Sequence, residues 1–148
     1  MFDNVLVREL MTKPVMIATP QTTLRSAHQL MKEHRIRRLP VLDEGRLVGI
    51  ITIGDVKEAS PSDATSLSIW EINYLWAQLT VEKVMTHHVF TISADAPILD
   101  AAELMLQHKI SGLPVVDGEG KLVGILTESD IFRMLVMSRV RAIVPSPT

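Results

Sequence analysis

The chain has 148 residues, of which 47% are hydrophobic and 22% charged, and its formal net charge is −2. This composition is typical of one compact soluble domain or of two small halves that pack closely. A near-neutral chain lacks the clustered Lys and Arg that give a nucleic-acid surface its affinity. No apolar run approaches the ~20 residues that a membrane span requires, so we expect neither a nucleic acid nor a membrane as partner.

The sequence contains no cysteine. A disulfide framework, a thiolate metal site and a cysteine nucleophile are therefore excluded, and the composition fits a reducing compartment. The N-terminal residues 1–5 carry an early acidic residue and no apolar segment of the kind found in a signal peptide. We therefore expect a cytoplasmic protein.

The first part of the chain predicts the element order β-α-β-β-α after an initial helical turn. The strands are predicted from short apolar and β-branched runs, and the longer helix from apolar residues at helical spacing. The turn Asp43-Glu44-Gly45-Arg46 separates two of the strands and predicts a hairpin. The predicted turn, strand, helix, hairpin strands and final helix lie at residues 7–12, 15–18, 22–35, 36–42, 47–52 and 55–59.

A turn-rich linker, residues 59–64, precedes a further predicted helix. Ser68 followed three residues later by Glu71 is a capping-box pattern that marks the start of this helix. Both tryptophans and the only tyrosine lie here, at Trp70, Tyr74 and Trp76. They either pack the helix onto the body of the protein, as apolar residues at helical spacing commonly do, or form a dimer or partner surface.

The second part of the chain repeats the first. The segment from Leu-Pro-Val at 39–41 to Asp55 reappears from 113–115 to Asp130, with one additional residue in the intervening turn. Met-Thr at 11–12 likewise reappears at 85–86. The predicted organisation is repeat 1 at 1–59, a linker and connecting helix at 60–80, repeat 2 at 81–138, and a C-terminal tail at 139–148. The strand and final helix of repeat 2 are predicted at 89–92 and 130–137.

Each repeat contains Gly-x-x-Thr-x-x-Asp, with Thr52 and Asp55 in the first copy and Thr127 and Asp130 in the second. A predicted strand runs into a helix start there, where backbone N–H groups favour anions and a threonine hydroxyl can contact phosphate. A carboxylate three residues later can accept hydrogen bonds from a ribose diol. The same pattern also caps a helix, with Thr as N-cap and Asp at N3, so the residues predict nucleotide binding, capping, or both.

Signals for catalysis are lacking. No Ser/His/Asp order, no Gly-rich phosphate loop with its Lys and no metal-spaced carboxylate cluster stands out. His87 and His88 are adjacent, and neighbouring side chains point apart on an extended chain. We therefore expect neither an enzyme nor a metal site.

The doubled motifs resemble a tandem pair of cystathionine-beta-synthase (CBS) domains, the Bateman module. The resemblance covers nearly the whole chain and rests on the two Met-Thr pairs, the two Leu-Pro-Val triplets, and Leu-Val-Gly-Ile-x-Thr-x-x-Asp ending at Asp55 and Asp130. The linker is similar to that of acetoin-utilisation regulatory proteins, whose additional C-terminal domain has no room here. We therefore expect a stand-alone CBS pair.

The resemblance implies an α/β fold of two β-α-β-β-α repeats related by a pseudo-two-fold axis and packed as one CBS pair. Members of the family commonly bind adenosine nucleotides in clefts between the repeats and form disc-like dimers. The implied partners are an adenosine nucleotide, a second copy of the chain and an unidentified effector protein. No cofactor is obligatory, because the adenine nucleotide is a regulatory ligand.

The resemblance also assigns roles by position. Asp55 and Asp130 would bind ribose hydroxyls, and Thr52 and Thr127 would contact phosphate. Other residues would surround adenine or, directly before Leu-Pro-Val, reach the phosphates. The adenine residues are Val15, Ile17, Ala18, Val89, Thr91 and Ile92, and the phosphate residues are Arg37, Arg38, Ser111 and Gly112.

The function expected from these residues is regulatory. The chain would bind AMP, ADP or ATP and transmit the ligand state by a conformational or dimer-packing change. The paired Arg37 and Arg38 favour adenine nucleotides over S-adenosylmethionine, and predict that their site prefers the more highly charged nucleotide. The alternatives are a structural or protein-interaction module without nucleotide binding, and a sensor of S-adenosylmethionine.

Overall fold

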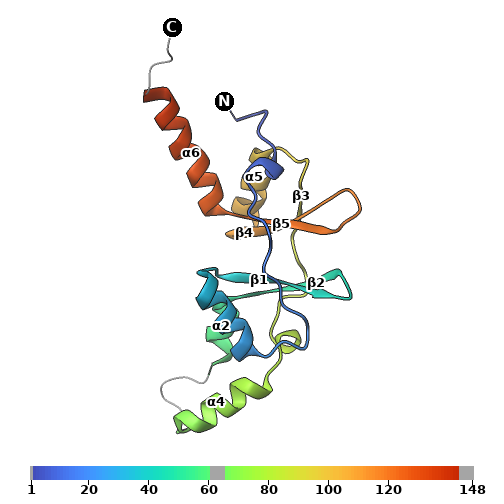
Figure 1. The fold of residues 1–148 in the computed structure, drawn as a ribbon, viewed down its shortest axis with the longest axis vertical. Helices are drawn as coiled ribbons and strands as arrows, with labels where there is room; N and C mark the ends of the chain where they lie inside the picture. The colour runs from blue at the N-terminus through green and yellow to red at the C-terminus, as the bar shows by residue number, and fades with distance from the viewer. Residues whose placement is uncertain (1, 61–65, 144–148) are drawn as a thin grey trace. The chain divides into compact units, whose positions relative to one another are not determined.

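A computed structural model describes residues 2–60 and 66–143. It has the predicted α/β class and consists of two compact units (Figure 1). Unit 1 comprises Met1–Val15 and Phe90–Thr148, and unit 2 comprises Met16–Val89. The N-terminal segment thus belongs to the unit that contains most of repeat 2.

Unit 2 is built around an antiparallel hairpin. Strands β1 and β2 pair from Arg38–Thr52 to Asp43–Arg46. Glu44 and Gly45 both have positive φ, 51° and 80°, as the two-residue turn of a tight hairpin requires, so the predicted hairpin is confirmed. The elements of this unit are α2 (Leu24–His34), β1 (Arg38–Asp43), β2 (Arg46–Thr52), α3 (Ile53–Ala59), α4 (Ile69–Gln78) and the 3₁₀ helix η1 (Val81–Lys83).

Unit 1 contains a three-stranded sheet in the order β3-β4-β5. Strand β3 is parallel to β4, and β4 is antiparallel to β5. The elements of this unit are α1 (Val7–Leu10), β3 (Ile92–Ser93), α5 (Ile98–His108), β4 (Gly112–Val116), β5 (Leu122–Thr127) and α6 (Glu128–Ile143).

The first strand of each repeat is shorter than predicted. In repeat 1 only Ala18 joins the sheet, through one parallel bridge to Val41. Pro14 and Pro20 flank this segment and cannot donate to a strand ladder, which limits its pairing. In repeat 2 the strand begins only at Ile92.

The last helix is longer than predicted. It runs to Ile143, past the expected end at 137 and into the segment assigned to the C-terminal tail. No Pro or Gly interrupts the chain between Asp130 and Pro145, so nothing in the sequence stops the helix earlier. The rest of the predicted tail, residues 144–148, and residues 61–65 of the linker lie outside the described residues.

Each unit has its own buried hydrophobic cluster. Helix α2 contributes Leu24, Ala27 and Met31 to the cluster of unit 2, as its apolar spacing predicts. Helix α5 contributes Ile98, Ala101 and Met105 at the equivalent positions of unit 1. The Leu and Val of each Leu-Pro-Val triplet are fully buried beside them.

The Met-Thr segments are exchanged between the repeats. Thr12, from repeat 1, pairs with Ile125 on β5, and the two N–H···O bonds measure 2.8 and 3.0 Å. Thr86, from repeat 2, pairs in the same way with Ile50 on β2, at 3.0 and 2.9 Å. The repeats of the sequence and the compact units of the structure are therefore different divisions of the chain.

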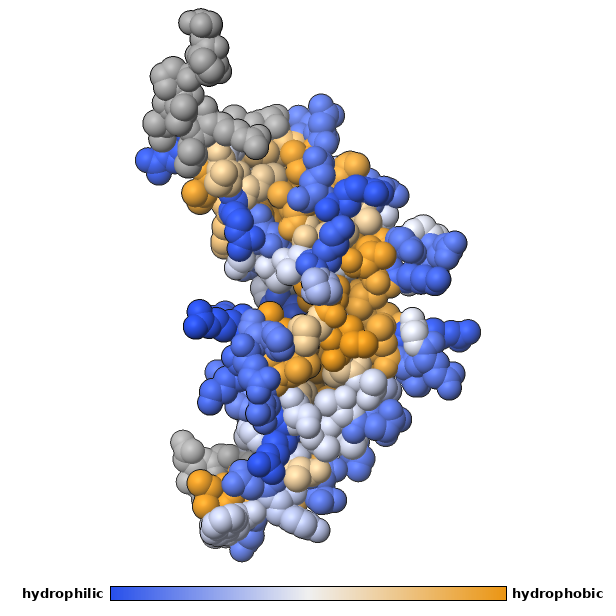
Figure 2. All heavy atoms as spheres, viewed as in Figure 1, coloured by the Kyte–Doolittle hydropathy of each residue, from blue (hydrophilic) through white to orange (hydrophobic). Residues whose placement is uncertain are grey.

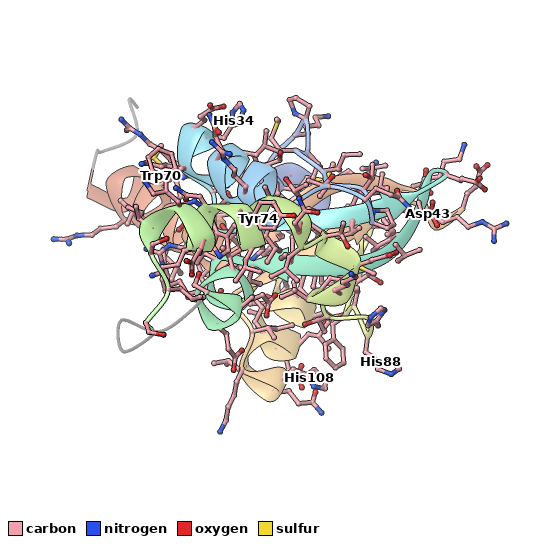
Figure 3. All side chains as sticks on the ribbon, turned by 90° about the horizontal axis from the view of Figure 1, so that it is seen from below. His34, Asp43, Trp70, Tyr74, His88 and His108 are labelled. Atoms are coloured by element: carbon pink, nitrogen blue, oxygen red, sulfur yellow. The ribbon has the colours of Figure 1, made fainter. Side chains whose placement is uncertain are left out.

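Helix α4 begins as its capping pattern predicts, because Ser68 Oγ accepts a hydrogen bond from Glu71 N–H at 3.2 Å. Trp76 is half-buried, packs against the core of unit 2 and meets His28 edge to face at 5.2 Å. Trp70 and Tyr74 are 80% and 66% exposed, and both are labelled on α4 in Figure 3. Packing onto the body is therefore confirmed for Trp76 and wrong for the other two.

Within the described part of the chain, no helix is both long enough and apolar enough to cross a bilayer.

Candidate nucleotide site

The repeat 1 motif forms the junction of β2 and α3. Thr52 is the N-cap of α3, and its Oγ1 accepts a hydrogen bond from Asp55 N–H at 3.2 Å. In return, Asp55 Oδ2 accepts from Thr52 N–H at 2.8 Å. This reciprocal pair confirms the capping interpretation of the motif.

The hairpin brings the arginines of repeat 1 to the same junction. Arg38 is the register partner of Thr52. The carbonyl oxygen of Arg37 accepts a hydrogen bond from Ile53 N–H, the first residue of α3, at 2.8 Å. The structure therefore places Arg37, Arg38, Thr52 and Asp55 at one end of the hairpin.

The repeat 2 motif has the same backbone arrangement. Gly112 is the register partner of Thr127, and the carbonyl oxygen of Ser111 accepts from Glu128 N–H at 3.0 Å. Asp130 Oδ2 accepts from Thr127 N–H at 2.9 Å and from Thr127 Oγ1 at 3.3 Å. The two predicted positions thus share their backbone geometry and the bond from the threonine N–H to the carboxylate. They differ in the threonine hydroxyl, which accepts from Asp55 N–H in repeat 1 and donates to the Asp130 carboxylate in repeat 2.

The residues expected to surround adenine are divided between the units. Ala18 is buried at the edge of β1, and Ile17 beside it is 38% exposed. Ile92 pairs with Val115 on β4, next to the exposed Thr91. Val15 of repeat 1 belongs to unit 1, and Val89 of repeat 2 belongs to unit 2. Each is therefore in the unit that contains most of the other repeat.

Two residues at Asp130 were not identified from the sequence. Arg133 Nη1 donates to Asp130 Oδ1 at 3.0 Å, and Thr12 Oγ1 donates to the same oxygen at 3.3 Å. Only 4% of Asp130 is exposed. The available signal was a break in the repeat, because Glu58 stands three residues after Asp55 where Arg133 stands three after Asp130.

A cavity of about 640 Å³ in unit 1 lies next to this pair of charges. Its volume is in the range of small-molecule sites. Of the residues expected to bind nucleotide, only Asp130 lines it. The lining residues come from the N-terminal segment and α6, namely Phe2, Val5, Glu9, Leu10, Asp130, Arg133, Met134, Met137 and Ser138.

A cavity of about 540 Å³ in unit 2 contains none of the expected residues. Helices α2 and α4 form its walls, through Arg25, His28, Gln29, Lys32, Glu33, Asn73 and Trp76. The nucleotide prediction therefore has no support from this cavity.

The duplicated α/β arrangement and its paired Thr-x-x-Asp junctions define a tandem repeat protein of the CBS type. The family model of the CBS domain matches residues 7–62 and 81–137. The chain belongs to the CBS domain family.

The curated relatives differ greatly in length. A CBS domain-containing protein of Dictyostelium discoideum is 35% identical over 134 residues, which cover 90% of this chain and 92% of that protein. L-aspartate semialdehyde sulfurtransferase of Methanocaldococcus jannaschii is also 35% identical, over 87% of this chain but only 23% of the enzyme. A second protein of that organism is covered to 47%. The match to the sulfurtransferase therefore concerns less than a quarter of that enzyme.

The solved structures that resemble this chain are CBS pairs. The CBS domain pair of protein MJ0100, in complex with 5′-methylthioadenosine and S-adenosyl-L-methionine, has a TM-score of 0.75 and 33% identity over 90% of this chain and 98% of that one. CBSX2 in complex with AMP has a TM-score of 0.73 and 29% identity, again over 90% and 98%. A Vibrio cholerae protein provisionally assigned to acetoin utilization (AcuB) has a TM-score of 0.77 and 28% identity over 97% and 98%.

Proposed function

We propose that this chain is a non-catalytic regulatory module that binds adenosine-containing nucleotides, with one binding position at each Thr-x-x-Asp junction. The observation that carries the proposal is the duplicated junction itself. In each unit a threonine, a carboxylate and the residue before Leu-Pro-Val meet at one hairpin end. Solved CBS pairs of similar identity contain AMP, or 5′-methylthioadenosine and S-adenosyl-L-methionine.

The proposed roles follow from the groups present at each junction. The carboxylates of Asp55 and Asp130 would accept hydrogen bonds from ribose hydroxyls, as acidic residues do in dinucleotide folds. The hydroxyls of Thr52 and Thr127 would contact phosphate after they exchange their local hydrogen bonds. Adenine would lie against the apolar segments 15–18 and 89–92.

The two positions differ in charge. Repeat 1 has Arg37 and Arg38 before its Leu-Pro-Val, and repeat 2 has Ser111 and Gly112. Charge-assisted hydrogen bonds from Arg are roughly twice as strong as neutral ones. The repeat 1 position would therefore prefer the more highly charged nucleotide, and Arg38→Ala would lower the affinity for ATP more than that for AMP.

S-adenosylmethionine is the second candidate ligand. It is favoured by the complex of the MJ0100 CBS pair, which is 33% identical to this chain. It shares the adenine and ribose of AMP and carries, in place of the phosphate, a sulfonium centre attached to an amino acid. A position that contains two arginines would discriminate against it, so the choice depends on which junction it would enter.

A thermal-shift panel tests the proposal. AMP, ADP, ATP, S-adenosylmethionine, 5′-methylthioadenosine and GTP would be compared on the wild type and on Asp55→Asn/Asp130→Asn. Asn keeps the cap but supplies only one acceptor oxygen. A ligand at a hundred times its Kd adds about 2.7 kcal/mol of stability, which raises Tm by several degrees.

The outcomes separate the candidate functions. A shift with adenosine compounds that is lost in the double variant supports the sensor. The absence of any shift on folded, nucleotide-free protein would favour a structural or protein-interaction module instead. A shift with S-adenosylmethionine alone would favour the second ligand.

Signal transmission would use self-association. Helix α6 exposes the apolar side chains of Phe132, Leu135, Val136 and Met137, and apolar residues of this unit reach the surface in Figure 2. Exposed apolar patches commonly mark interaction sites. We expect a homodimer whose packing responds to ligand and is read by an effector protein, and light scattering with and without AMP would measure its mass.

A further inference from the structure

The repeat 2 position is closed by an internal competitor, and the repeat 1 position is not. We propose that Arg133 occupies the carboxylate of Asp130 that a ribose diol would need, so that repeat 1 binds its ligand first. This inference rests on the proposed function. It concerns the order in which the two positions fill.

The argument begins with the hydrogen-bonding capacity of a carboxylate. Its two oxygens together offer about four acceptor sites. Asp130 has four hydrogen bonds: Oδ2 accepts from Thr127 N–H and Oγ1, and Oδ1 accepts from Arg133 and Thr12. Its capacity is full, and it is only 4% exposed. A diol can bind there only after a present partner leaves.

Arg133 is the partner that can leave most easily. The bond from Thr127 N–H is fixed by the backbone at the junction of β5 and α6. The side chain of Arg133 is 68% exposed and has a flexible stem, so its guanidinium regains water when it moves away. Arg133 also lines the 640 Å³ cavity, which leaves room for that movement.

Asp55 lacks this competitor. Among the described residues, its side chain accepts one hydrogen bond, from Thr52 N–H to Oδ2. The position equivalent to Arg133 is Glu58, which repels a carboxylate instead of binding it. Asp55 therefore retains acceptor sites for a diol without rearrangement.

An NMR titration with adenosine tests the inference. Adenosine carries the diol but no charge, so it separates competition for the carboxylate from attraction of a phosphate by Arg133. The amides of Thr52 and Thr127 donate to Asp55 and Asp130 and report on each position separately. In the wild type, the chemical-shift change of the Thr52 amide should reach saturation at a lower adenosine concentration than that of the Thr127 amide.

Removal of the competitor should make the two positions more equal. Arg133→Met keeps a long apolar stem and removes the charge. The titration curve of the Thr127 amide should then shift to about fivefold lower adenosine concentration, which corresponds to about 1 kcal/mol because a tenfold change in affinity is 1.4 kcal/mol. The Thr52 curve should not change. Arg139→Met, which removes the same charge from an exposed position of the same helix, should change neither curve.

The diol requirement provides a further control. With 2′,3′-dideoxyadenosine, Arg133→Met should give no gain at Thr127. Glu58→Arg places the competitor in repeat 1 and should weaken adenosine binding as reported by the Thr52 amide. Because this variant leaves Arg133 unchanged, it tests the inference even if Arg133→Met does not fold.

The failures are distinguishable. If Arg133→Met leaves the Thr127 curve in place or weakens it, or if Glu58→Arg leaves the Thr52 curve in place, the competitor assignment is overturned. If neither amide responds to adenosine or AMP in any folded variant, the proposed function itself fails.

Discussion

The two Thr-x-x-Asp junctions have the same sequence pattern and the same backbone, yet their aspartates are in different environments. Asp55 is half-buried and belongs to a local capping box. Asp130 is almost fully buried and also bonds Arg133, one turn along α6, and Thr12, from the opposite end of the chain. The difference shows that a duplicated motif keeps its backbone geometry while its surroundings decide what its side chains bind.

The largest expected difference between the junctions is in stability. Asp130→Ala removes four hydrogen bonds and leaves Thr12 and Arg133 without their acceptor, so we expect a loss of about 3 kcal/mol in the free energy of unfolding. Asp55→Ala removes the N3 carboxylate of the capping box but leaves the Thr52 N-cap, so it should cost about 1 kcal/mol. Urea denaturation of both variants measures the difference, and equal losses would contradict the comparison.

A smaller effect tests the exchange of the Met-Thr segments. A Cβ on Gly124 would lie 2.5 Å from Met11 Sδ and 3.2 Å from Met11 Cβ, so Gly124→Ala should cost about 2 kcal/mol. Gly49→Ala meets Met85 Sδ at 2.5 Å and the Thr86 carbonyl oxygen at 3.0 Å and should cost a similar amount.

Hydrogen exchange distinguishes the two glycine variants. Gly124→Ala should increase the exchange rate of the Thr12 amide, which donates to the carbonyl oxygen of Ile125, and should leave the Thr86 amide protected. Gly49→Ala should do the reverse, because Thr86 N–H bonds Ile50 O. If each variant instead increased the amide exchange of the Met-Thr segment of its own repeat, the pairing of each Met-Thr segment with the other repeat would be contradicted.

The hydroxyl of Thr12 should contribute less. Thr12→Val removes one 3.3 Å hydrogen bond to Asp130 and should cost about 0.5–1 kcal/mol. Thr86→Val is the matched control at the equivalent position of repeat 2. Denaturation should show a larger loss for Thr12→Val, and a larger loss for the control would show that the hydroxyl bond does not matter.

The smallest effect concerns the hairpin turn of unit 1. The backbone N–H of Lys121, and then that of Glu119, donate to Asp117 Oδ1 and lower the pKa of this carboxyl below its usual 3.8. A carboxyl with a lowered pKa stabilises the folded state at pH values above its usual pKa, and this contribution is lost as pH falls through the lowered pKa. Asp117→Asn should therefore reduce Tm slightly at neutral pH, and the difference should shrink below pH 3.8.

A pH series of Tm on the wild type and Asp117→Asn measures this effect. Because both hydrogen bonds to the Asp117 carboxylate are exposed to solvent, the change should be smaller than that of Thr12→Val. A difference between the two proteins that grows as pH falls would show that the turn is not stabilised by the charged carboxylate.

The sequence by itself determined the local features of this protein. Periodicity and turn chemistry predicted α2 and the first hairpin, because each depends on residues within a few positions of one another. The repetition of the sequence extended both predictions to α5 and the second hairpin. The duplicated Thr-x-x-Asp predicted both helix starts for the same reason. The doubled motifs also predicted the family, which the CBS family model confirms.

The tertiary structure alone decided which distant segments meet. Residues 1–15 pack with repeat 2, although the sequence places them in repeat 1. The surface position of Trp70 and Tyr74 could not be predicted, since apolar spacing does not say whether a helix face is covered. Nor could the full occupation of Asp130, because contact between residues 118 positions apart depends on packing and leaves no local pattern in the sequence.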